Sequence, residues 1–333
     1  MPPGPATPDA RGGGTRPIDA SGTSQREIMS TESIEQIGNA GSQPASRPTP
    51  QAASARPPHA TLETVAAALR SGRMIPYLGP DVLKAAAPSM PLVPLLPEDL
   101  AAALNAKVAV PGRIRNNLWQ TAQFIESRRH RKTLTALMAE IFRTPVPPTA
   151  LHRALAKLPL PLIVDTWYDG AMRTALAESG RTDWGEVQGT TRAHATRDIW
   201  TKAYDASGTE VDPAEAAAWT TVLYKPHGSV VPDKNFLVSD SDYVEVLTEI
   251  DIQTPIPAVV QERRHGRAFA FVGARFHEQT LRIFAHQITK RAAEGHVALV
   301  EPDGLTRNES RFLAIWDVFP LAAGPAALAD HLA

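Results

Sequence analysis

The chain has 333 residues, of which 43% are hydrophobic, enough for one large globular domain or two smaller ones. A formal net charge of −1 and a pI of about 6.8 exclude a global electrostatic attraction to nucleic acid or to anionic membranes. Cysteine is absent, which excludes disulfides and thiolate zinc sites and agrees with a reducing cytoplasm. No apolar run approaches the roughly 20 residues of a membrane span, and no signal-peptide core is present. We therefore expect a cytoplasmic protein with neither nucleic acid nor a membrane as partner.

The first 60 residues differ in composition from the rest. They contain 10 of the 30 prolines and a Gly12-Gly13-Gly14 run, and the first aromatic residue of the chain is Tyr77. Such a segment buries too little apolar surface to offset its ordering entropy. We expect residues 1–60 to be disordered and residues 61–333 to form one domain. Met29 is a second candidate start of translation, and the sequence leaves both starts open.

From residue 61 on, helical and strand-like patterns alternate. Apolar spacing predicts helices over residues 61–70, 97–106, 117–128, 133–142, 149–158 and 169–178, with strands over residues 74–78 and 162–166. Residues 181–220 are less regular, and residues 184–191 and 199–204 are interpreted there as an excursion of strands. Further strands are expected over residues 222–225, 236–238, 268–272, 297–300 and 316–319, and helices over residues 242–250 and 278–291, near Arg311 and from Pro325. This alternation predicts an α/β fold with a Rossmann-like doubly wound parallel sheet.

The first expected helix has a recognisable start. Thr61 suits the N-cap position, and the carboxylate of Glu63 in the first turn complements the helix dipole. A full capping box is not expected, because the third position after Thr61 is Thr64 rather than Glu or Gln.

Five short segments place polar or small residues at strand ends and helix starts. They read MIPYLGPD from Met74, WQTAQ from Trp119, LIVDTWYD from Leu162 after His152, YKPHGS from Tyr224 followed by Asp242-Tyr243, and FVGARFHE from Phe271. Their order and spacing, from about Arg73 to the C-terminus, resemble the sirtuin-like (silent-information-regulator-like) domain family, whose members bind and often cleave NAD. The resemblance implies a DHS-type NAD/FAD-binding fold with NAD as the cofactor.

The resemblance also implies roles for individual residues. His227 matches the histidine that acts as general base on the nicotinamide ribose, and an imidazole that titrates near neutrality suits that role. A histidine beside a glycine can instead hydrogen-bond the backbone of a turn, but the residues around His227 match the family too. The positions that match the cofactor-binding loops are Gly79, Asp81, Thr166, Tyr168, Gly228, Ser229, Gly273 and Glu278, the last in place of the family's Asp.

Several residues depart from the family pattern or admit two interpretations. Pro80 has no N–H to offer a pyrophosphate, and the carboxylate of Asp81 would repel one; we favour Asp81 as the cap of a helix over residues 82–87. Trp167 replaces the family's Asn and is expected to fill the nicotinamide pocket, with stacking on the nicotinamide ring as the catalytic alternative. Asp169 is a candidate catalytic acid, although we favour it as the start of the next helix.

Other charged segments carry weaker signals. The basic runs at residues 127–132 and 263–265 are typical of solvated turns. His277-Glu278 lacks a second histidine at the zinc-protease spacing, and His286 and His296 lack partners at ligand spacing. We therefore expect no metal site.

Two functions remain open from the sequence. The favoured one is a degenerate sirtuin-like domain with weak or no NAD hydrolysis, which acts by binding an NAD or ADP-ribose-like nucleotide or an unknown protein partner. The alternative is an active NAD glycohydrolase that uses His227. A protein deacylase is disfavoured, since sirtuin deacylases generally carry a four-cysteine zinc module. In either case we expect the four strand ends at Leu78, Thr166, Lys225 and Val272 to surround one cavity with Gly79, Trp167, His227 and Gly273.

Overall fold

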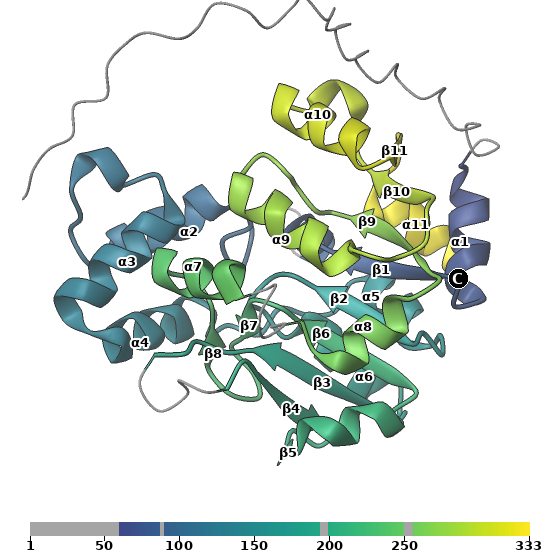
Figure 1. Cartoon of the computed structure of the whole chain (residues 1–333), viewed down its shortest axis with the longest axis horizontal. Coiled ribbons are helices and arrows are strands. Elements are labelled where there is room, and N and C mark those ends of the chain that lie inside the picture. The colour runs from purple at the N-terminus through teal and green to yellow at the C-terminus, as the bar shows by residue number, and fades with distance from the viewer. Residues whose placement is uncertain (1–59, 87–89, 194–198, 250–255) are drawn as a thin grey trace, which may run out of the picture. The chain divides into compact units, whose positions relative to one another are not determined.

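A nine-stranded sheet runs through the computed structural model, which describes residues 60–86, 90–193, 199–249 and 256–333 (Figure 1). The segment expected to be disordered, residues 1–60, lies outside these ranges apart from Ala60. The sheet order is β11-β10-β9-β1-β2-β6-β3-β4-β5. The strands are β1 Met74–Leu78, β2 Leu162–Asp165, β3 Trp184–Gly189, β4 Thr201–Asp205, β5 Glu210–Val211, β6 Thr221–Lys225, β9 Ala268–Val272, β10 His296–Leu299 and β11 Val318–Leu321.

The sheet is parallel from β11 to β3, and β4 and β5 extend one edge in antiparallel fashion. The predicted α/β, Rossmann-like fold is confirmed, with the correction that this antiparallel edge makes the sheet mixed. Strand β1 lies where the order reverses, since β2 and β6 continue on one side and β9, β10 and β11 on the other. In open α/β sheets, ligands bind in the crevice beyond the carboxyl ends of the strands at such a reversal.

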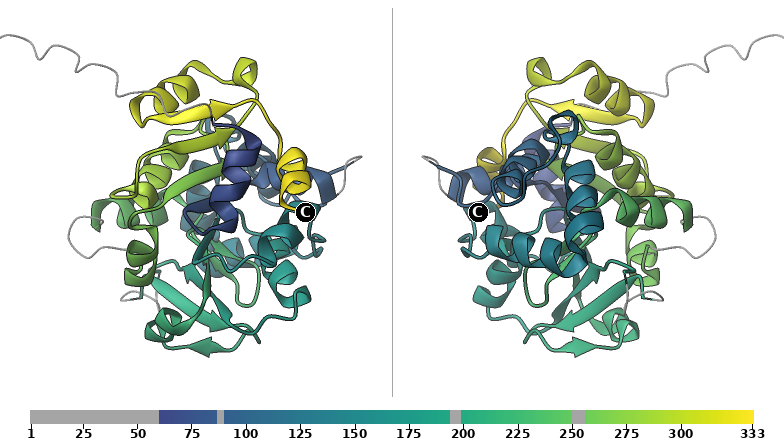
Figure 2. Two further views of the ribbon diagram at one scale, coloured as in Figure 1. Left: turned by 90° about the vertical axis from the view of Figure 1, so that its right-hand side faces the viewer. Right: turned by 90° about the vertical axis from the view of Figure 1, so that its left-hand side faces the viewer.

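Helices cover both faces of the sheet (Figure 2). One face carries α1 Leu62–Arg70, α5 Ala150–Ala156, α6 Ala171–Glu178 and α11 Pro325–Leu332, with α1 and α11 side by side. The other carries α2 Pro97–Asn105, α3 Leu118–Arg129, α4 Arg131–Ile141, α7 Asp240–Glu249, α8 Ala258–Arg264, α9 Gln279–Thr289 and α10 Arg307–Ile315. Strand β1 feeds both cores, because successive side chains point to opposite faces: Met74 and Leu78 enter one, Ile75 and Tyr77 the other.

Short elements complete the fold. The 3-10 helices are η1 Pro80–Ala86, η2 Gly112–Ile114, η4 Pro213–Ala218 and η5 Pro302–Gly304. Beyond β6, β7 Gly228–Ser229 pairs antiparallel with β8 Asn235–Phe236 in a separate two-stranded sheet. Gly228 therefore forms part of this small sheet, opposite Phe236.

The structure departs from the sequence expectations at several elements. Thr64 does close a capping box, because its hydroxyl accepts from the N–H of Thr61 while its own N–H donates to the Thr61 hydroxyl. The helix expected after Asp81 is the 3-10 helix η1, and it starts at Pro80 with Asp81 inside its first turn rather than at its cap. Helix α8 and strand β5 were not expected; both are short, and short elements carry little periodic signal.

Within the described ranges, no helix combines the length and the hydropathy needed to cross a membrane.

Candidate functional site

The loops after β1 and β9 meet at the reversal of strand order. The N–H of Gly79 donates to Val272 O (2.9 Å), and that of Asp81 donates to Gly273 O (3.1 Å). A Cβ on Gly79 would lie only 2.3 Å from Gly273 O, so the approach of the two backbones requires glycine. The Asp81 N–H, which in a nucleotide-binding loop would face a pyrophosphate, is thus used within the fold.

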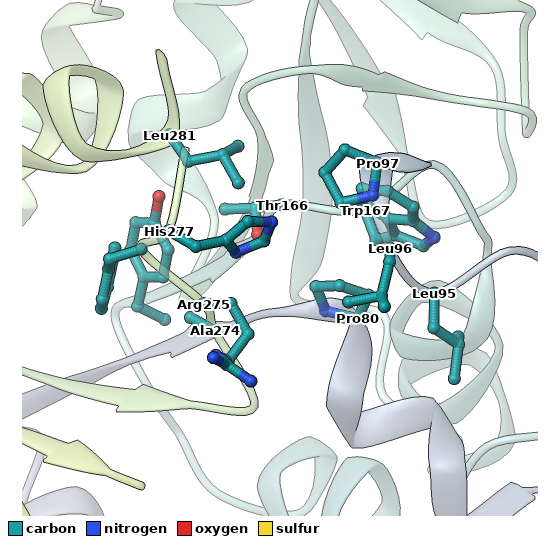
Figure 3. Close-up of a pocket in the computed structure, with 12 residues that line it drawn as sticks. Pro80, Leu95, Leu96, Pro97, Thr166, Trp167, Ala274, Arg275, His277 and Leu281 are labelled. Carbon is teal, nitrogen blue, oxygen red and sulfur yellow. The ribbon is translucent and has the colours of Figure 1, made fainter. Parts of the chain in front are cut away.

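A small pocket, here called the aromatic pocket, lies beside these loops at the end of β2 (Figure 3). Its lining includes Pro80, Leu95, Thr166, Trp167, Ala274 and His277. The cavity volume is about 20 Å³, room for about one water molecule. A nicotinamide ring does not fit in this space without movement of the lining.

Trp167 accounts for much of this closure. Its side chain is buried, and its indole Nε1 donates to Pro94 O at 2.8 Å. The ring packs edge-on against Phe142 and tilted against Tyr168. A tryptophan fixed by a hydrogen bond and by two aromatic neighbours is a packed core residue, with its single donor satisfied.

His227 lies in a separate buried position. Its Nδ1 is 2.8 Å from the Tyr243 hydroxyl, and its ring centroid is 4.7 Å from that of Phe284. Burial, reinforced by the charge of Lys225, lowers the pKa of His227 to about 3, so the imidazole is neutral at physiological pH. Its Nε2 has no hydrogen-bond partner among the described residues. The residue does not line the aromatic pocket.

A buried ion pair joins the ends of β2 and β6. The Nζ of Lys225 donates to Asp165 Oδ2 (2.8 Å) and to the backbone oxygen of Asp169 (2.7 Å). Burial raises the pKa of Asp165 to about 6, while the ammonium of Lys225 opposes that rise. Burial lowers the pKa of Lys225, but nearby carboxylates led by Asp165 more than offset this and hold it above its ordinary value. The carboxylate of Asp169 accepts from the N–H of Ala171 in the first turn of α6, which supports the helix-start interpretation.

The hydroxyl groups expected near a cofactor are also engaged inside the fold. Thr166 donates to the last backbone carbonyl of β1 (2.8 Å), and Tyr168 donates to Leu237 O (2.8 Å). Ser229 donates to the backbone oxygen of Asp169 at 3.0 Å. At this end of the sheet, the polar groups stabilise the closed arrangement of the loops.

A larger opening, here called the strand-end cavity, lies on the other side of β1. It has a volume of about 250 Å³ and is bounded by the ends of β9 and β10 and the start of α11. Its charged lining residues are Asp81, Lys84, Arg275 and Glu301. Asp81 and Lys84 form an ion pair with one another at 2.9 Å. Of the residues expected around one cavity, Gly273 lines this opening, Trp167 lines the aromatic pocket, and His227 lines neither.

Arg275 separates the two cavities, since it lines both. Its guanidinium forms a two-pronged pair with the fully buried carboxylate of Glu309, at 2.9 and 3.1 Å. Glu309 also accepts from the N–H groups of Thr306 and Phe276. Sequence reasoning missed this pair; the Thr306-x-x-Glu309 capping-box spacing was the available signal.

The interpretation of the two basic runs as solvated turns is wrong for Arg131 in the first run and for Arg263 and Arg264 in the second, since Arg263 donates to backbone carbonyls far along the chain, among them Pro161 O. Arg131 is buried and pairs with Asp242 (2.7 Å) and Glu126 (3.1 Å), which ties α4 to the start of α7. Arg264 is also buried, and it donates to two backbone carbonyls at the end of α9. Neither partner was predictable from local spacing, although Asp242 belongs to one of the five landmark segments.

Glu278 lies immediately before α9, where it occupies the N-cap position without a side-chain capping hydrogen bond. It follows His277, which lines the aromatic pocket, but Glu278 itself lines neither that pocket nor the loops around Gly273 that open beyond β9.

Residues 161–321 match the family model described as SIR2-like domain. The match spans β2 to β11, including the segments around Trp167, His227 and Gly273, and leaves out β1 and its loop. No curated protein matches the chain. The match over residues 161–321, the mostly parallel sheet and the landmark segments support a sirtuin-like domain in this part of the chain.

Proposed function

We propose that this protein is a divergent sirtuin-like domain that binds an NAD-related nucleotide, of the ADP-ribose type, and hydrolyses NAD weakly or not at all. The observation that carries the proposal is the closure of the aromatic pocket around Trp167, to about 20 Å³. Hydrolysis requires the nicotinamide ribose to be held against a base and a water molecule. Because side chains fill the aromatic pocket, the nicotinamide ribose of NAD cannot take up this position.

The state of His227 supports the same proposal. Its imidazole is walled by Tyr243 and Phe284 and is separate from the aromatic pocket. A general base works best when its pKa lies near the operating pH, and a pKa of about 3 makes this imidazole a weak proton acceptor.

The strand-end cavity supplies the nucleotide-binding part of the proposal. It lies beyond the carboxyl ends of β9 and β10, where α/β sheets bind nucleotides. Lys84 offers a cation to a phosphate, and Glu301, just after β10, suits the ribose hydroxyls as a hydrogen-bond acceptor. We expect ADP-ribose to bind as well as NAD does, because the nicotinamide adds no contact.

The competing function is an active NAD glycohydrolase that uses His227. One observation favours it: Nε2 of His227 is buried and has no hydrogen-bond partner within the described part of the chain, as expected of a base that accepts a proton from a substrate. Opening of the aromatic pocket by movement of Trp167 would have to accompany this activity.

Two measurements on the full chain separate these functions. Calorimetric titration with NAD, ADP-ribose and nicotinamide tests binding, and nicotinamide release measured by fluorescence tests hydrolysis. We expect comparable affinities for NAD and ADP-ribose, no binding of nicotinamide, and no faster release from wild type than from His227→Ala. Clear turnover that disappears in His227→Ala would establish the glycohydrolase instead.

Variants then locate the nucleotide. Glu301→Gln should weaken ADP-ribose binding by about 1 kcal/mol, roughly fivefold, because a neutral amide oxygen accepts a weaker hydrogen bond from a ribose hydroxyl than a carboxylate does. Asp303→Asn, an exposed carboxylate nearby that does not line the cavity, is the matched control. Trp167→Asn alone should not restore hydrolysis, because Pro80 and Asp81 still oppose a pyrophosphate. The triple variant Trp167→Asn/Pro80→Ala/Asp81→Ser should at least strengthen NAD binding. Equal affinities in Glu301→Gln and the control would contradict the placement.

A further inference from the structure

Three potential metal ligands meet where α2 approaches the segment before α9. They are Glu98 in the first turn of α2, His277, and Glu278 at the N-cap of α9. One ligand atom from each lies within 4.8 Å of the other two. Local spacing does not reveal this cluster, because Glu98 lies far along the chain from His277 and Glu278, and only the folded structure brings the three together.

The imidazole of His277 is partly buried, and its ring nitrogens lack the hydrogen bonds expected of shielded polar atoms. Neither ring nitrogen has a hydrogen-bond partner among the described residues, and both nitrogen atoms are shielded from solvent. Figure 3 shows the ring directed toward Leu96 and Pro97, the residues just before Glu98. An unpaired polar group in such a position costs free energy unless something else satisfies it.

The spacing of the donors matches metal coordination better than a hydrogen bond. His277 Nε2 lies 3.4 Å from Glu98 Oε1 without forming a hydrogen bond. With Zn–N and Zn–O bonds of about 2.0–2.2 Å, two ligands of a tetrahedral zinc lie about 3.4 Å apart. The carboxylate of Glu98 is half-exposed, so it is free to close the remaining distance to Glu278.

Helix dipoles alone do not explain the cluster. Glu98 and Glu278 each stand at a helix N-terminus, where a carboxylate is favoured in any case. That effect gives no reason for an imidazole between them whose two nitrogens have no hydrogen-bond partner among the described residues. The nearest cation that lines the same pocket, Arg275, is neutralised by Glu309.

We propose that Glu98, His277 and Glu278 bind a divalent transition-metal ion, with Zn²⁺ the ion best suited to one imidazole and two carboxylates. The two carboxylates balance the charge of the ion. Three protein ligands leave a fourth position for water or a ligand atom at the rim of the aromatic pocket, which His277 and Pro97 both line. The ion would also link α2 to the segment before α9, the two walls of that pocket. This site is independent of NAD hydrolysis.

The test is calorimetric titration of chelator-treated full chain with ZnCl₂, and with MgCl₂ as the comparison. We expect one zinc per chain at micromolar or tighter affinity and far weaker magnesium binding, since magnesium prefers an all-oxygen site. His277→Gln and Glu98→Gln should each weaken zinc binding at least tenfold. The matched controls are His265→Gln, an exposed histidine, and Asp99→Asn, an exposed carboxylate of the same helix turn.

Cobalt provides a second readout. Co²⁺ added to wild type should give the visible absorption of a four-coordinate site, and His277→Gln should abolish it. Glu98 is half-exposed, so Glu98→Gln leaves the fold intact and keeps the test decisive even if His277→Gln destabilises the chain. The absence of zinc binding would overturn the proposal. Zinc binding of equal affinity in Glu98→Gln and in the controls, or magnesium binding as tight as zinc binding, would also overturn it and indicate adventitious binding only.

Discussion

The strand ends on the two sides of β1 belong to one sheet, but on one side they are filled by side chains and on the other they border an open cavity. On the β2–β6 side, Trp167 packs among aromatic rings, and Asp165 and Lys225 neutralise each other. On the β9–β10 side, the strand-end cavity keeps about 250 Å³ open between charged side chains. Both sides lie at the carboxyl ends of strands in the same sheet, so the fold alone does not decide whether a binding site is present. The volume of the side chains and the pairing of their charges decide it.

The contrast also separates two parts of a dinucleotide site. The closed side is where the resemblance puts the nicotinamide chemistry, and the open side is the part suited to the remainder of a nucleotide. A domain with one side filled and the other open is expected to bind without cleaving. Substitutions on each side test whether this division holds.

The largest effect is expected for Trp167→Ala on the closed side. Truncating a buried tryptophan should lower the free energy of unfolding by about 3–5 kcal/mol, through lost burial and the cavity left behind. Urea denaturation measures the change. Trp316→Ala, at an exposed tryptophan, should change stability by less than about 1 kcal/mol. Equal effects of the two substitutions would show that Trp167 is not a packed plug.

Lys225→Met should cost a similar amount at pH 7.5, roughly 3–5 kcal/mol, because it leaves the carboxylate of Asp165 buried and unpaired. In this variant the folded-state pKa of Asp165 lies above its unfolded value. The penalty is therefore largest above that folded pKa and shrinks as the pH falls and the carboxyl takes up a proton. Denaturation at pH 7.5 and pH 5.5 measures both effects. The double variant Asp165→Asn/Lys225→Met should be more stable than Lys225→Met at pH 7.5; a lower stability would contradict the ion-pair explanation.

Local patterns predicted the sheet well and the pairing of charges poorly. The bounds of β1 and β9 follow from apolar runs of five residues, and the structure reproduces both. The packing of Trp167 also follows from its residue type, since a large aromatic after a buried strand has little alternative to burial. Arg131 and Arg264 were misinterpreted because a basic run looks the same whether its members meet solvent or distant partners. Those partners, Asp242 and the end of α9, become neighbours only after the chain folds.

The cavities were beyond sequence reasoning for a related reason. Parallel strands place their loops along one edge, so Gly79, Trp167, His227 and Gly273 were expected together. Whether neighbouring loops leave a space depends on angles and side-chain contacts that no spacing encodes. His227 contacts Tyr243 and Phe284 and lines neither of the two cavities.

Glu309→Gln tests the ion pair between Glu309 and Arg275, the residue that lines both cavities. Burial alone would raise the pKa of Glu309, but Arg275 and hydrogen bonds from Thr306 and Phe276 lower it from its ordinary value of 4.5 to about 2. Because the folded pKa is the lower one, this contribution to stability is complete above pH 4.5 and is lost as the pH falls toward 2. The variant should lose roughly 3 kcal/mol at pH 7, with the difference from wild type shrinking through that window. Thermal melts between pH 7 and pH 3 test this, with the exposed Glu294→Gln as control; a deficit independent of pH would contradict the assignment.

The smallest effect on stability, and the most informative about binding, is expected for Asp81→Asn on the open side. Among the described residues, the ion pair of Asp81 is with Lys84, whose side chain is largely exposed, so the loss should stay below about 1 kcal/mol. The same change removes a negative charge from the lining of the strand-end cavity and frees Lys84 for a phosphate. If ADP-ribose binds there, its affinity should rise by about threefold to fivefold, the gain expected from removing one solvent-screened like charge. Calorimetric titration measures this, with Asp303→Asn as a control of equal charge change outside the cavity. Because the attraction between Lys84 and a phosphate is screened by salt, the gain should also shrink as salt is added. Equal affinities in the two variants would place the nucleotide elsewhere and remove the distinction between an open and a closed side.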